Sequence, residues 1–520
     1  MFLCNRIMKT VPIMAISLSM PLFVQTADAA TYRAPSVSIL QQKSDGAVKG
    51  QSFLSSAPEN ILWGRLPNRN TKPVLTIRSG ETITIDTVSH EGLLEDQGKN
   101  PEAYFGGHGV NSKNVLKDAL AITKSNIAHD FDKDGPHIVT GPVFVEGAKP
   151  GDVLKVEVLH LEPRVPYGVI SNRHYKGALP GEFPEGAKRQ GSASPHQPDK
   201  YGNVSVFTPI EKVDDRWYGI LKDGAKSLRF PLSPFVGIMG VTPDTEESWS
   251  SVPPARIGGN IDVNELGVGA TLYLPIEVEG AKFYSGDPHF VQGDGEVALT
   301  ALEGSLRATF RLTVLKNGSP AIPKTASDSL VSPFAETEKY WIPIGLDEDL
   351  DEAMKSSVRE SINFLSKQFG LDRRLVYAYL SAAVDYEVSQ VVDKTKGIHA
   401  LVPKADFNEL VSIQLNAGSD SIPVNIIRDT MYVPATQICK ALSLTLSQDK
   451  TEAEAPSGKI RFMVDSNRYA VNGISMYLEV SPIEKDGVLL LPVQAISEVM
   501  GISVTWATEG TKIIGTATKL

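Results

Sequence analysis

The chain has 520 residues, of which 42% are hydrophobic, and its formal net charge at pH 7 is −10. This length is enough for more than one domain with its own core, and the acidic balance argues against nucleic acid or an anionic membrane as the main partner. The two cysteines are Cys4 and Cys439. Because Cys4 lies in a segment that we expect to be removed, no intrachain disulfide is expected in the mature protein.

The first 29 residues have the pattern of a secretory signal peptide. Arg6 and Lys9 precede the apolar run Val11–Val24, and Ala27-Asp28-Ala29 follows it. A basic start, an apolar stretch of about 7–15 residues and a small-residue ending are typical of a segment that is cleaved on export. We predict cleavage after Ala29 and a secreted or envelope-associated protein, with a retained anchor as the alternative. Residues 30–59 are rich in Ser, Gln and Lys and are interpreted as a mobile leader.

Short apolar runs broken by Gly, Pro and Asp fill residues 75–315. Residues 74–77 and 82–85 flank a turn, and residues 153–158 and 306–312 alternate apolar with polar side chains. Many short strands separated by turns predict a mainly β domain, built as a sandwich or a barrel.

Two glycine-rich segments in this region carry an unusual density of polar side chains. They are residues 258–262 and 286–296, which we interpret as turns at opposite ends of the strand-like run 268–278. A single Asp-Gly or Gly-Asp is most often an ordinary turn. Here, however, glycines that allow close backbone approach surround six polar residues, which indicates a site. The six are Asn260, Asp262, His289, Gln292, Asp294 and Glu296.

Helical periodicity appears after the β-rich region. Residues 347–369 begin with acidic side chains, space apolar residues three or four apart and end before Gly370, which predicts a helix. A second helix is predicted over residues 372–392. Asp385 would lie on its apolar face, where a charge is costly unless it is paired. It either supports the site or forms a structural ion pair with Arg373 or Arg374.

The last hundred residues contain an internal repeat. Residues 431–444 align with residues 489–502, and each copy predicts a strand, a proline that opens a helix, and a returning strand. The pattern of the second copy resembles the copper amine oxidase N-terminal-like domain, so residues 418–520 are predicted to be a small α/β module. No histidine follows His399, and Cys439 is expected on a buried helix face, so copper binding is not expected. Attachment to the cell envelope or to another subunit is the role we expect.

Several motifs resemble the acetamidase/formamidase family of amide hydrolases. They are Gly258-Gly259-Asn260-x-Asp262, the Gly286–Glu296 segment, His137–Val143 with Glu146–Asp152 behind it, Gly345–Met354 and Ala383–Gln390. The resemblance implies a catalytic domain over residues 60–415 with jelly-roll-like sheets. It also implies that a small linear amide is cleaved to a carboxylate and ammonia, and that the protein is a homo-oligomer.

Amide hydrolysis needs an activated nucleophile, and the usual side-chain nucleophiles lack their signatures here. There is no G-x-S-x-G motif, and Cys439 lies outside the family-like region. A water activated by a metal or by a carboxylate remains. We predict that a divalent metal, zinc or alternatively calcium, is bound by His137, Asp262, His289 and Asp294. Each histidine taken alone is equally consistent with a structural hydrogen bond.

The remaining polar residues receive supporting roles. Glu296 is the predicted acid/base, Asn260 and Gln292 are predicted to donate to the substrate carbonyl, and Asp385 is predicted to support the site. His90 lies in a long insertion and is interpreted as a rim or ligand residue of the substrate pocket, with a plain surface histidine as the alternative. Because this insertion would reshape the pocket, the sequence does not specify formamide or acetamide as the substrate. A second hypothesis is an amidase-like binding protein without turnover, held at the envelope.

Overall fold

The computed structural model describes residues 38–186, 191, 194–198, 202–325, 329–408, 410, 412–427, 430–448, 451–455, 458–477, 480–509 and 512–519. The predicted signal peptide and its cleavage site lie outside these ranges. Within them, no helix combines the length and the apolar character that crossing a bilayer requires.

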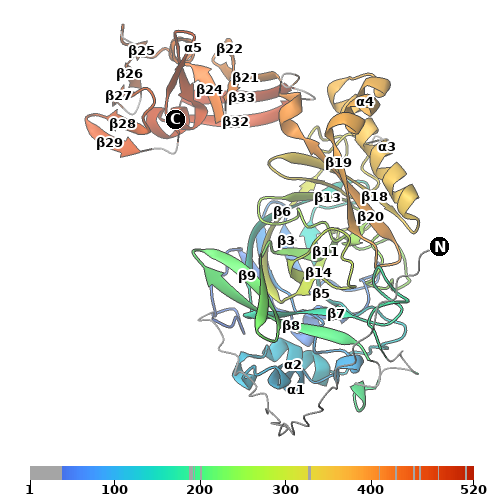
Figure 1. Cartoon of the computed structure of the whole chain (residues 1–520). Coiled ribbons are helices and arrows are strands. Elements are labelled where there is room, and N and C mark those ends of the chain that lie inside the picture. The colour runs from blue at the N-terminus through green and yellow to red at the C-terminus, as the bar shows by residue number, and fades with distance from the viewer. Residues whose placement is uncertain are drawn as a thin grey trace, which may run out of the picture. The chain divides into compact units, whose positions relative to one another are not determined.

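The prediction of a mainly β fold is confirmed, and two large sheets form most of the described region before the C-terminal module (Figure 1). Apolar residues of their strands are buried, including Ile83, Ile85, Val156 and Phe310. Burial alternates along residues 154–158, as the sequence pattern predicts, whereas residues 83–86 and 306–310 are buried on both faces. The first sheet has the order β1 (Ser52–Leu54), β4 (Thr82–Asp86), β16 (Leu306–Leu315), β6 (Val153–Pro163), β13 (Thr271–Pro275), β17 (Phe334–Glu336), β18 (Tyr340–Asp347), β20 (Lys396–Pro403) and β19 (Asp385–Gln390).

The second sheet holds the two glycine-rich segments. Its order is β10 (Lys226–Pro231), β9 (Arg216–Asp223), β8 (Val204–Val213), β7 (Tyr167–Asn172), β15 (Leu302–Glu303), β14 (Phe283–Val291), β11 (Phe235–Gly240) and β12 (Gly258–Asn260). Strand β5 (Ile138–Glu146) also pairs with β14, and it carries β2 (Ile61–Trp63) and β3 (Leu75–Arg78).

Strand β11 brings the glycine-rich segments together. Ile238 lies opposite Asn260 on β12 and opposite Gly286 on β14, so the two segments flank a single strand. We expected residues 286–296 to form a turn, but Gly286–Val291 belong to β14 and the loop begins after Val291. The two segments therefore meet side by side, rather than at opposite ends of the strand-like run between them.

The first predicted helix is confirmed as α3 (Leu350–Phe369). Asp349 caps it by accepting hydrogen bonds from the backbone N–H groups of Asp351 and Glu352, and Gly370 ends it with φ 68°. Its buried face contains Ala353 and Ser357, whereas the apolar Met354 is 37% exposed. These small side chains let the helix approach Gly345 of β18 closely.

The second predicted helix is wrong in its C-terminal half. Helix α4 (Arg373–Ala383) is followed directly by β19, in which Glu387 pairs with His399 of β20. Pairing with β20 outweighs the local helical pattern in this segment. Asp385 therefore lies at the start of an edge strand and is exposed, not on a helix face.

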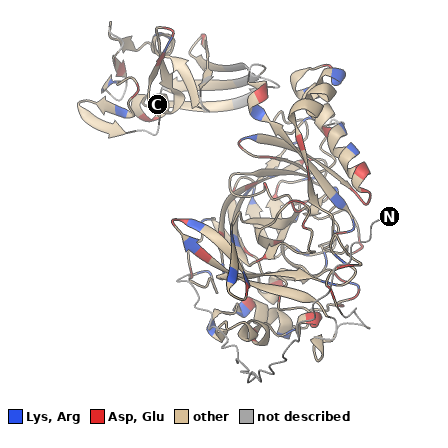
Figure 2. Cartoon of the chain, in the orientation of Figure 1, with Lys and Arg blue, Asp and Glu red and all other residues tan. Residues whose placement is uncertain are grey.

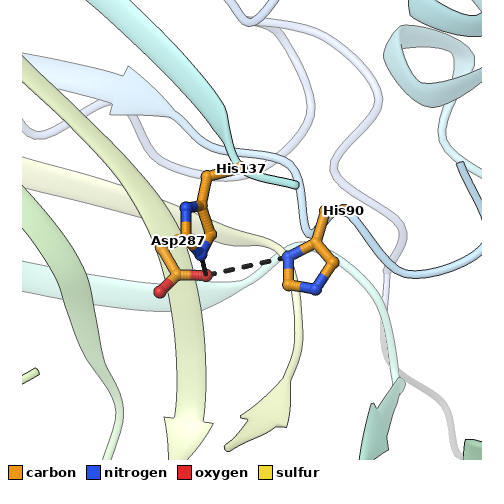
Figure 3. A group of neighbouring side chains, drawn as sticks. All are labelled: His90, His137 and Asp287. Carbon is orange, nitrogen blue, oxygen red and sulfur yellow. Dashed lines mark ion pairs between the residues drawn. The ribbon is translucent and has the colours of Figure 1, made fainter. Parts of the chain in front are cut away.

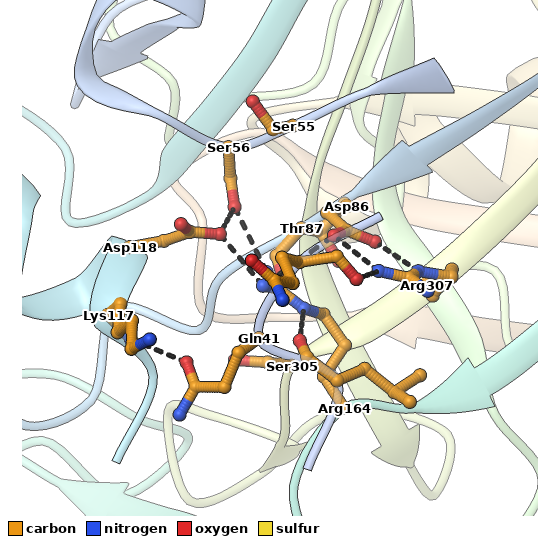
Figure 4. A network of polar contacts seen from close by, with 12 residues as sticks. Gln41, Ser55, Ser56, Asp86, Thr87, Lys117, Asp118, Arg164, Ser305 and Arg307 are labelled. Carbon is orange, nitrogen blue, oxygen red and sulfur yellow. Dashed lines mark hydrogen bonds and ion pairs between the residues drawn. The ribbon is translucent and has the colours of Figure 1, made fainter. Parts of the chain in front are cut away.

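The expected mobile leader is corrected for residues 38–59, which pack against the β-rich domain. Leu40 is only 1% exposed, and β1 runs parallel to β4. Two buried arginines hold the segment: Arg164 Nε donates to the Leu40 carbonyl at 3.0 Å, and Arg307 Nη2 donates to the Gln42 carbonyl at 3.0 Å. Figure 4 shows these arginines with the carboxylates of Asp86 and Asp118. Each guanidinium is also paired with a carboxylate, because a buried charge without a partner would be costly.

An insertion between β4 and β5 supplies most of the remaining helical turns of the β-rich domain. These are η2 (Glu95–Gln97), α1 (Pro101–Gly107), η3 (Ser112–Asn114) and α2 (Lys117–Lys124), while η1 (Pro58–Asn60) precedes β2 and η5 (Lys404–Phe407) follows β20. Asn100 caps α1 by accepting from the Ala103 N–H. Arg173, after β7, anchors the insertion through ion pairs with Asp96 at 2.7 Å and Glu91 at 3.2 Å.

The C-terminal module has its own core, formed by residues 415–517. The predicted repeat is confirmed: β24 (Thr430–Pro434) with α5 (Ala435–Ala441) corresponds to β31 (Val488–Pro492) with α6 (Val493–Met500), and β24 pairs with β31. One sheet of the module has the order β22 (Asp420–Pro423), β21 (Ser412–Ala417), β33 (Lys512–Lys519), β32 (Ile502–Glu509). Another has the order β23 (Asn425–Ile427), β24, β31, β30 (Ile483–Lys485). A third has the order β25 (Thr445–Leu446), β26 (Glu452–Ala455), β27 (Gly458–Arg461), β28 (Arg468–Val471), β29 (Ile474–Tyr477).

The module begins earlier than predicted. Strand β21 starts at Ser412 and pairs with β33 near the C-terminus, so it belongs to the module rather than to the catalytic domain. Phe407, in contrast, packs in the core of the preceding domain. The boundary therefore falls between Phe407 and Ser412.

Charged residues of both signs are interspersed on the surface helix α3 (Figure 2). Lys355 pairs with Glu352 at 2.6 Å on its exposed face. This helix thus presents no stripe of a single charge of the kind that binds nucleic acid.

Candidate active site

A cavity of about 470 Å³ opens where the second sheet, the insertion after β4 and the loops following β14 and β19 meet. Four of the predicted site residues line it: His90, His137, Asn260 and Glu296. Four buried charged residues that we did not predict line it as well: Asp287, Glu303, Asp393 and Arg173. Most of these ionisable side chains are buried, so the wall of the cavity concentrates charge.

Asp287 is the centre of the first half of the site (Figure 3). The His137 Nε2 atom lies 3.7 Å from Asp287 Oδ1, and the His90 Nδ1 atom lies 3.8 Å from the same oxygen. Ser251 Oγ, 2.9 Å from His137 Nδ1, fixes the orientation of that ring. His90 is therefore not a rim residue, because it is 2% exposed and converges with His137 on one carboxylate.

The second half of the site lies on the other side of Asp287. The His289 Nε2 atom is 3.0 Å from Asp287 Oδ2 and 3.1 Å from Glu303 Oε1, and His289 Nδ1 is 4.0 Å from Asp262 Oδ1. Gly237 of β11 makes room for this cluster. A Cβ atom at Gly237 would lie 2.2 Å from Asp262 Oδ1 and 2.8 Å from Asp287 Oδ2.

The crowding of buried charges separates the pKa values of these groups. Burial, reinforced by the charge of Asp287, raises the pKa of Asp262 and that of Glu303 to about 7 each. Burial would also raise the pKa of Asp287, but the neighbouring His137 and His289 outweigh it and lower that pKa. Burial lowers the pKa of His137 to about 4, so this imidazole is neutral near pH 7 and can act as a ligand.

The donor atoms of the site fit a divalent cation. Asp287 Oδ1 and both ring nitrogens of His90 and of His289 are buried without a hydrogen-bond partner. Such buried atoms are costly unless they bind something. Several groups of three residues have ligand atoms close enough together to bind one ion, and two of them share Asp287: His90 with His137 and Asp287, and Asp262 with Asp287 and His289. Imidazole nitrogen combined with carboxylate oxygen is a common ligand set for zinc.

Glu296 stands beside this cluster on the cavity wall. It follows the loop after β14 with φ 47°, is 7% exposed, and has ligand atoms close to those of His289 and Glu303. Burial first, and then the charges of Asp262 and Asp393, raises its pKa well above the ordinary value. Asn260 Nδ2 donates to Asp393 Oδ2 at 2.7 Å, which leaves Asn260 Oδ1 without a partner.

Three predicted residues do not join the site. Gln292 lies beneath it, since its Nε2 donates to the backbone carbonyls of Asp262 and Ser389 instead of to a substrate. Asp294 is exposed and accepts from Asn264 Nδ2, away from the other predicted ligands. Asp385, exposed on β19, does not line the cavity.

The residues that we missed differ in how visible they were. Asp287 is two residues before the predicted His289 on one strand and therefore shares its face, a signal that the sequence contained. Glu303 lies opposite His289 only through the pairing of β14 with β15, and this register is not readable from either segment. Asp393 was missed because the strand before it was predicted to be a helix, and Gly237 because its role is to leave space.

Comparison with known proteins agrees with this fold and these motifs. The chain is 26% identical over 311 residues to a formamidase of Methylophilus methylotrophus, covering 52% of this chain and 76% of that protein. It is 28% identical over 211 residues to an acetamidase of Mycolicibacterium smegmatis, covering 33% of this chain and 52% of that one. The chain thus spans about half the length, 52%, of two of the curated relatives that it matches.

A solved structure of an acetamidase from Bacillus halodurans superposes with a TM-score of 0.51 and 25% sequence identity, covering 69% of this chain and 99% of the other. The model of the copper amine oxidase N-terminal domain matches residues 416–514, where the repeat lies. The model of the acetamidase/formamidase family matches residues 118–250 and 245–409, which together exceed half of the chain. The chain therefore belongs to the acetamidase/formamidase family.

Proposed function

We propose that this protein is an exported amidohydrolase that cleaves a linear amide to a carboxylate and ammonia. The observation that carries the proposal is the convergence of three buried histidines and several carboxylates around Asp287, beside the cavity that Glu296 lines. The names of the formamidase and acetamidase relatives support the same reaction. In this reaction a water oxygen adds to the amide carbon, the C–N bond breaks, and the departing nitrogen takes up a proton.

The residues proposed to hold a divalent cation are His90, His137, Asp262, Asp287 and His289. We propose zinc rather than calcium, because calcium prefers oxygen ligands and this set is rich in imidazole. A zinc ion bound there supplies Lewis acidity and a water whose pKa is lowered to about 7.

Glu296 is proposed as the acid/base. Its raised pKa keeps a proton on the carboxyl group near neutral pH, and its place on the cavity wall lets it pass that proton to the leaving nitrogen. Asn260 receives a revised role. Because its Nδ2 group already donates to Asp393, the free Oδ1 atom is suited to accept an N–H of the substrate amide.

The cavity volume bears on the substrate. About 470 Å³ falls within the range for ligand pockets of roughly 300–1,000 Å³ and leaves room for an acyl chain longer than that of acetamide. Part of its wall comes from the insertion and from the loop after β7, through His129 and Tyr175. We therefore propose linear amides as the substrate class without restricting the acyl group to one carbon or two.

Localisation and assembly are further parts of the proposal. The basic and apolar N-terminal pattern ending at Ala29 supports export, and a separately folded C-terminal module supports retention at the cell envelope. A homo-oligomer is proposed from the resemblance to the family.

The test is ammonia release by purified mature protein from linear amides of increasing acyl length, compared with Glu296→Gln. This variant keeps the size and polarity of the side chain but cannot transfer a proton, so turnover is expected to fall by about 10²–10⁴-fold. Glu338→Gln, at an exposed position, is the matched control and should behave as wild type. Unchanged turnover in Glu296→Gln would assign the acid/base role to another carboxylate.

Metal content and ammonia release, measured together, separate a hydrolase from a binding protein. We expect zinc in the purified protein and loss of ammonia release after chelation, restored by added zinc. A protein that retains zinc and binds amides without releasing ammonia would instead be the non-catalytic relative. A metal-free protein with full activity would overturn the proposal of a metal site and leave a mechanism in which a carboxylate activates the water.

A further inference from the structure

A second cluster of ligand-type side chains lies outside the cavity. His399 of β20 and Glu387 of β19 meet Glu265 from the loop between β12 and β13. His399 Nε2 lies 2.9 Å from Glu265 Oε2 and 3.5 Å from Glu387 Oε2. None of these three residues lines the cavity, so the cluster is a separate feature.

The histidine of this cluster is fully buried and directed at the carboxylates. Its side chain is 0% exposed, and its Nδ1 atom is 2.8 Å from Ser389 Oγ, which fixes the ring. His399 Nε2 and Glu265 Oε2 form an ion pair at 2.9 Å, yet neither of these buried atoms makes a well-aligned hydrogen bond. Close but misaligned donor atoms are what ligands of a common ion present.

The spacing and the accessibility suit a small divalent ion. Ligands about 2.0–2.1 Å from a tetrahedral zinc ion lie about 3.3 Å from one another. The two distances from His399, 2.9 Å and 3.5 Å, bracket that value. The Glu265 and Glu387 side chains are 18% and 30% exposed, so an ion can reach the cluster from solvent.

Asp294 adds a third carboxylate at the edge. Its side chain hydrogen-bonds Glu387, and the charge of Glu265 also acts on it. Without an ion, these carboxylates therefore crowd one another around a single imidazole.

We propose that Glu265, Glu387 and His399, with Asp294 at the edge, form a second divalent-cation site of zinc type, distinct from the site in the cavity.

The ion would fasten the loop that carries Glu296. This loop is already joined to β19, since the Gly295 N–H donates to the Val388 carbonyl at 2.6 Å and Gln292 Nε2 donates to the Ser389 carbonyl at 2.9 Å. Asp294 lies in the same loop, two residues before Glu296. The second site thus has a positioning role and does not touch the substrate.

The experiment compares the zinc content of full-length mature protein with that of Glu387→Gln and, separately, Glu265→Gln. Each protein is stripped with a chelator, reloaded with zinc alone and measured by elemental analysis, with circular dichroism to verify folding. Both variants should hold about one equivalent less than wild type, because removing a ligand weakens affinity by at least about 100-fold. Asp385→Asn, at an exposed carboxylate on the same strand, is the control and should match wild type.

Two further measurements keep the second site distinguishable from the first. Gly237→Ala disturbs the cluster at the cavity, so it should keep the zinc ion of the second site. Glu387→Gln should lose that ion. Cobalt in place of zinc should give a visible absorption component that disappears in Glu387→Gln and Glu265→Gln. Folded variants with the zinc content and cobalt spectrum of wild type would overturn the proposal and leave a protonated His399 paired with its carboxylates.

Discussion

At the scale of single residues, Gly237 shows how an absent side chain builds the cavity site. Its position on β11 faces Asp262, Asp287 and His289, and the space that a Cβ would occupy is already filled by their atoms. Three charged side chains can therefore gather against backbone at a point where any larger residue would separate them.

Gly237→Ala is expected to abolish the cavity metal while the rest of the fold survives. A Cβ 2.2 Å from Asp262 Oδ1 must displace that carboxylate, and overpacking of this kind costs about 1–3 kcal/mol. Turnover should fall by about 100-fold or more, in line with a displaced reacting group. Zinc analysis and ammonia release measure both effects. Gly107→Ala, where a Cβ meets nothing within 4 Å, is the matched control, and equal behaviour of the two variants would contradict this role.

At the scale of elements, the insertion after β4 is held over the cavity by a charged contact. Glu95 of η2 accepts from Lys99 Nζ at 2.7 Å and lies 3.3 Å from His129 Nδ1. The His129 ring, which lines the cavity, stacks on Trp63 with centroids 4.5 Å apart. Burial alone would raise the pKa of Glu95, but His129 and Lys99 outweigh it and lower that pKa to about 2.

This shift predicts the pH dependence of stability. Because the folded pKa lies below the unfolded value of 4.5, the ionised Glu95 contributes stability above pH 4.5, and the contribution is lost as the pH falls towards 2. Glu95→Gln should lower the free energy of unfolding by about 1–2 kcal/mol at pH 7, after allowance for solvent screening. The difference in the free energy of unfolding between wild type and Glu95→Gln should shrink as the pH falls from 4.5 to 2.

Urea unfolding of both proteins across this range measures the gap, and Glu102→Gln, exposed on α1, is the control. A gap that is the same at pH 7 and pH 3 would show that Glu95 acts through packing alone.

At the scale of the whole molecule, the C-terminal module folds around its own residues and lies beyond the family match. Deleting residues 410–520 should leave ammonia release and metal content within about twofold of the full-length protein, because Phe407 and the core that it joins are kept. Retention at the cell envelope should be lost. Fractionated cells producing either form test this. A truncated protein that stays folded but loses turnover would assign the module a part in catalysis.

The sequence by itself determined the features that depend on neighbours along the chain. Asp349 and Gly370 mark the ends of α3 because capping acts within one helical turn. The repeat around Pro434 and Pro492 was visible because each copy has the same local pattern. Glu296 and Asn260 were identifiable as residues of the cavity because glycine-rich segments permit close backbone approach, and His137 and His289 as members of a cluster because the family motifs contain them.

Only the tertiary structure decided which of these groups meet. Glu303 faces His289, and Asn260 lies across β11 from Gly286, through strand register, which depends on contacts between segments that are distant in sequence. The pairing of β19 with β20 turned a predicted helix into a strand. It thereby exposed Asp385 and placed Glu387 opposite His399. Asp294 contacts Glu387 there instead of joining the cluster at the cavity. Local pattern is silent on such contacts, because the free energy that selects them comes from burial and pairing across the fold.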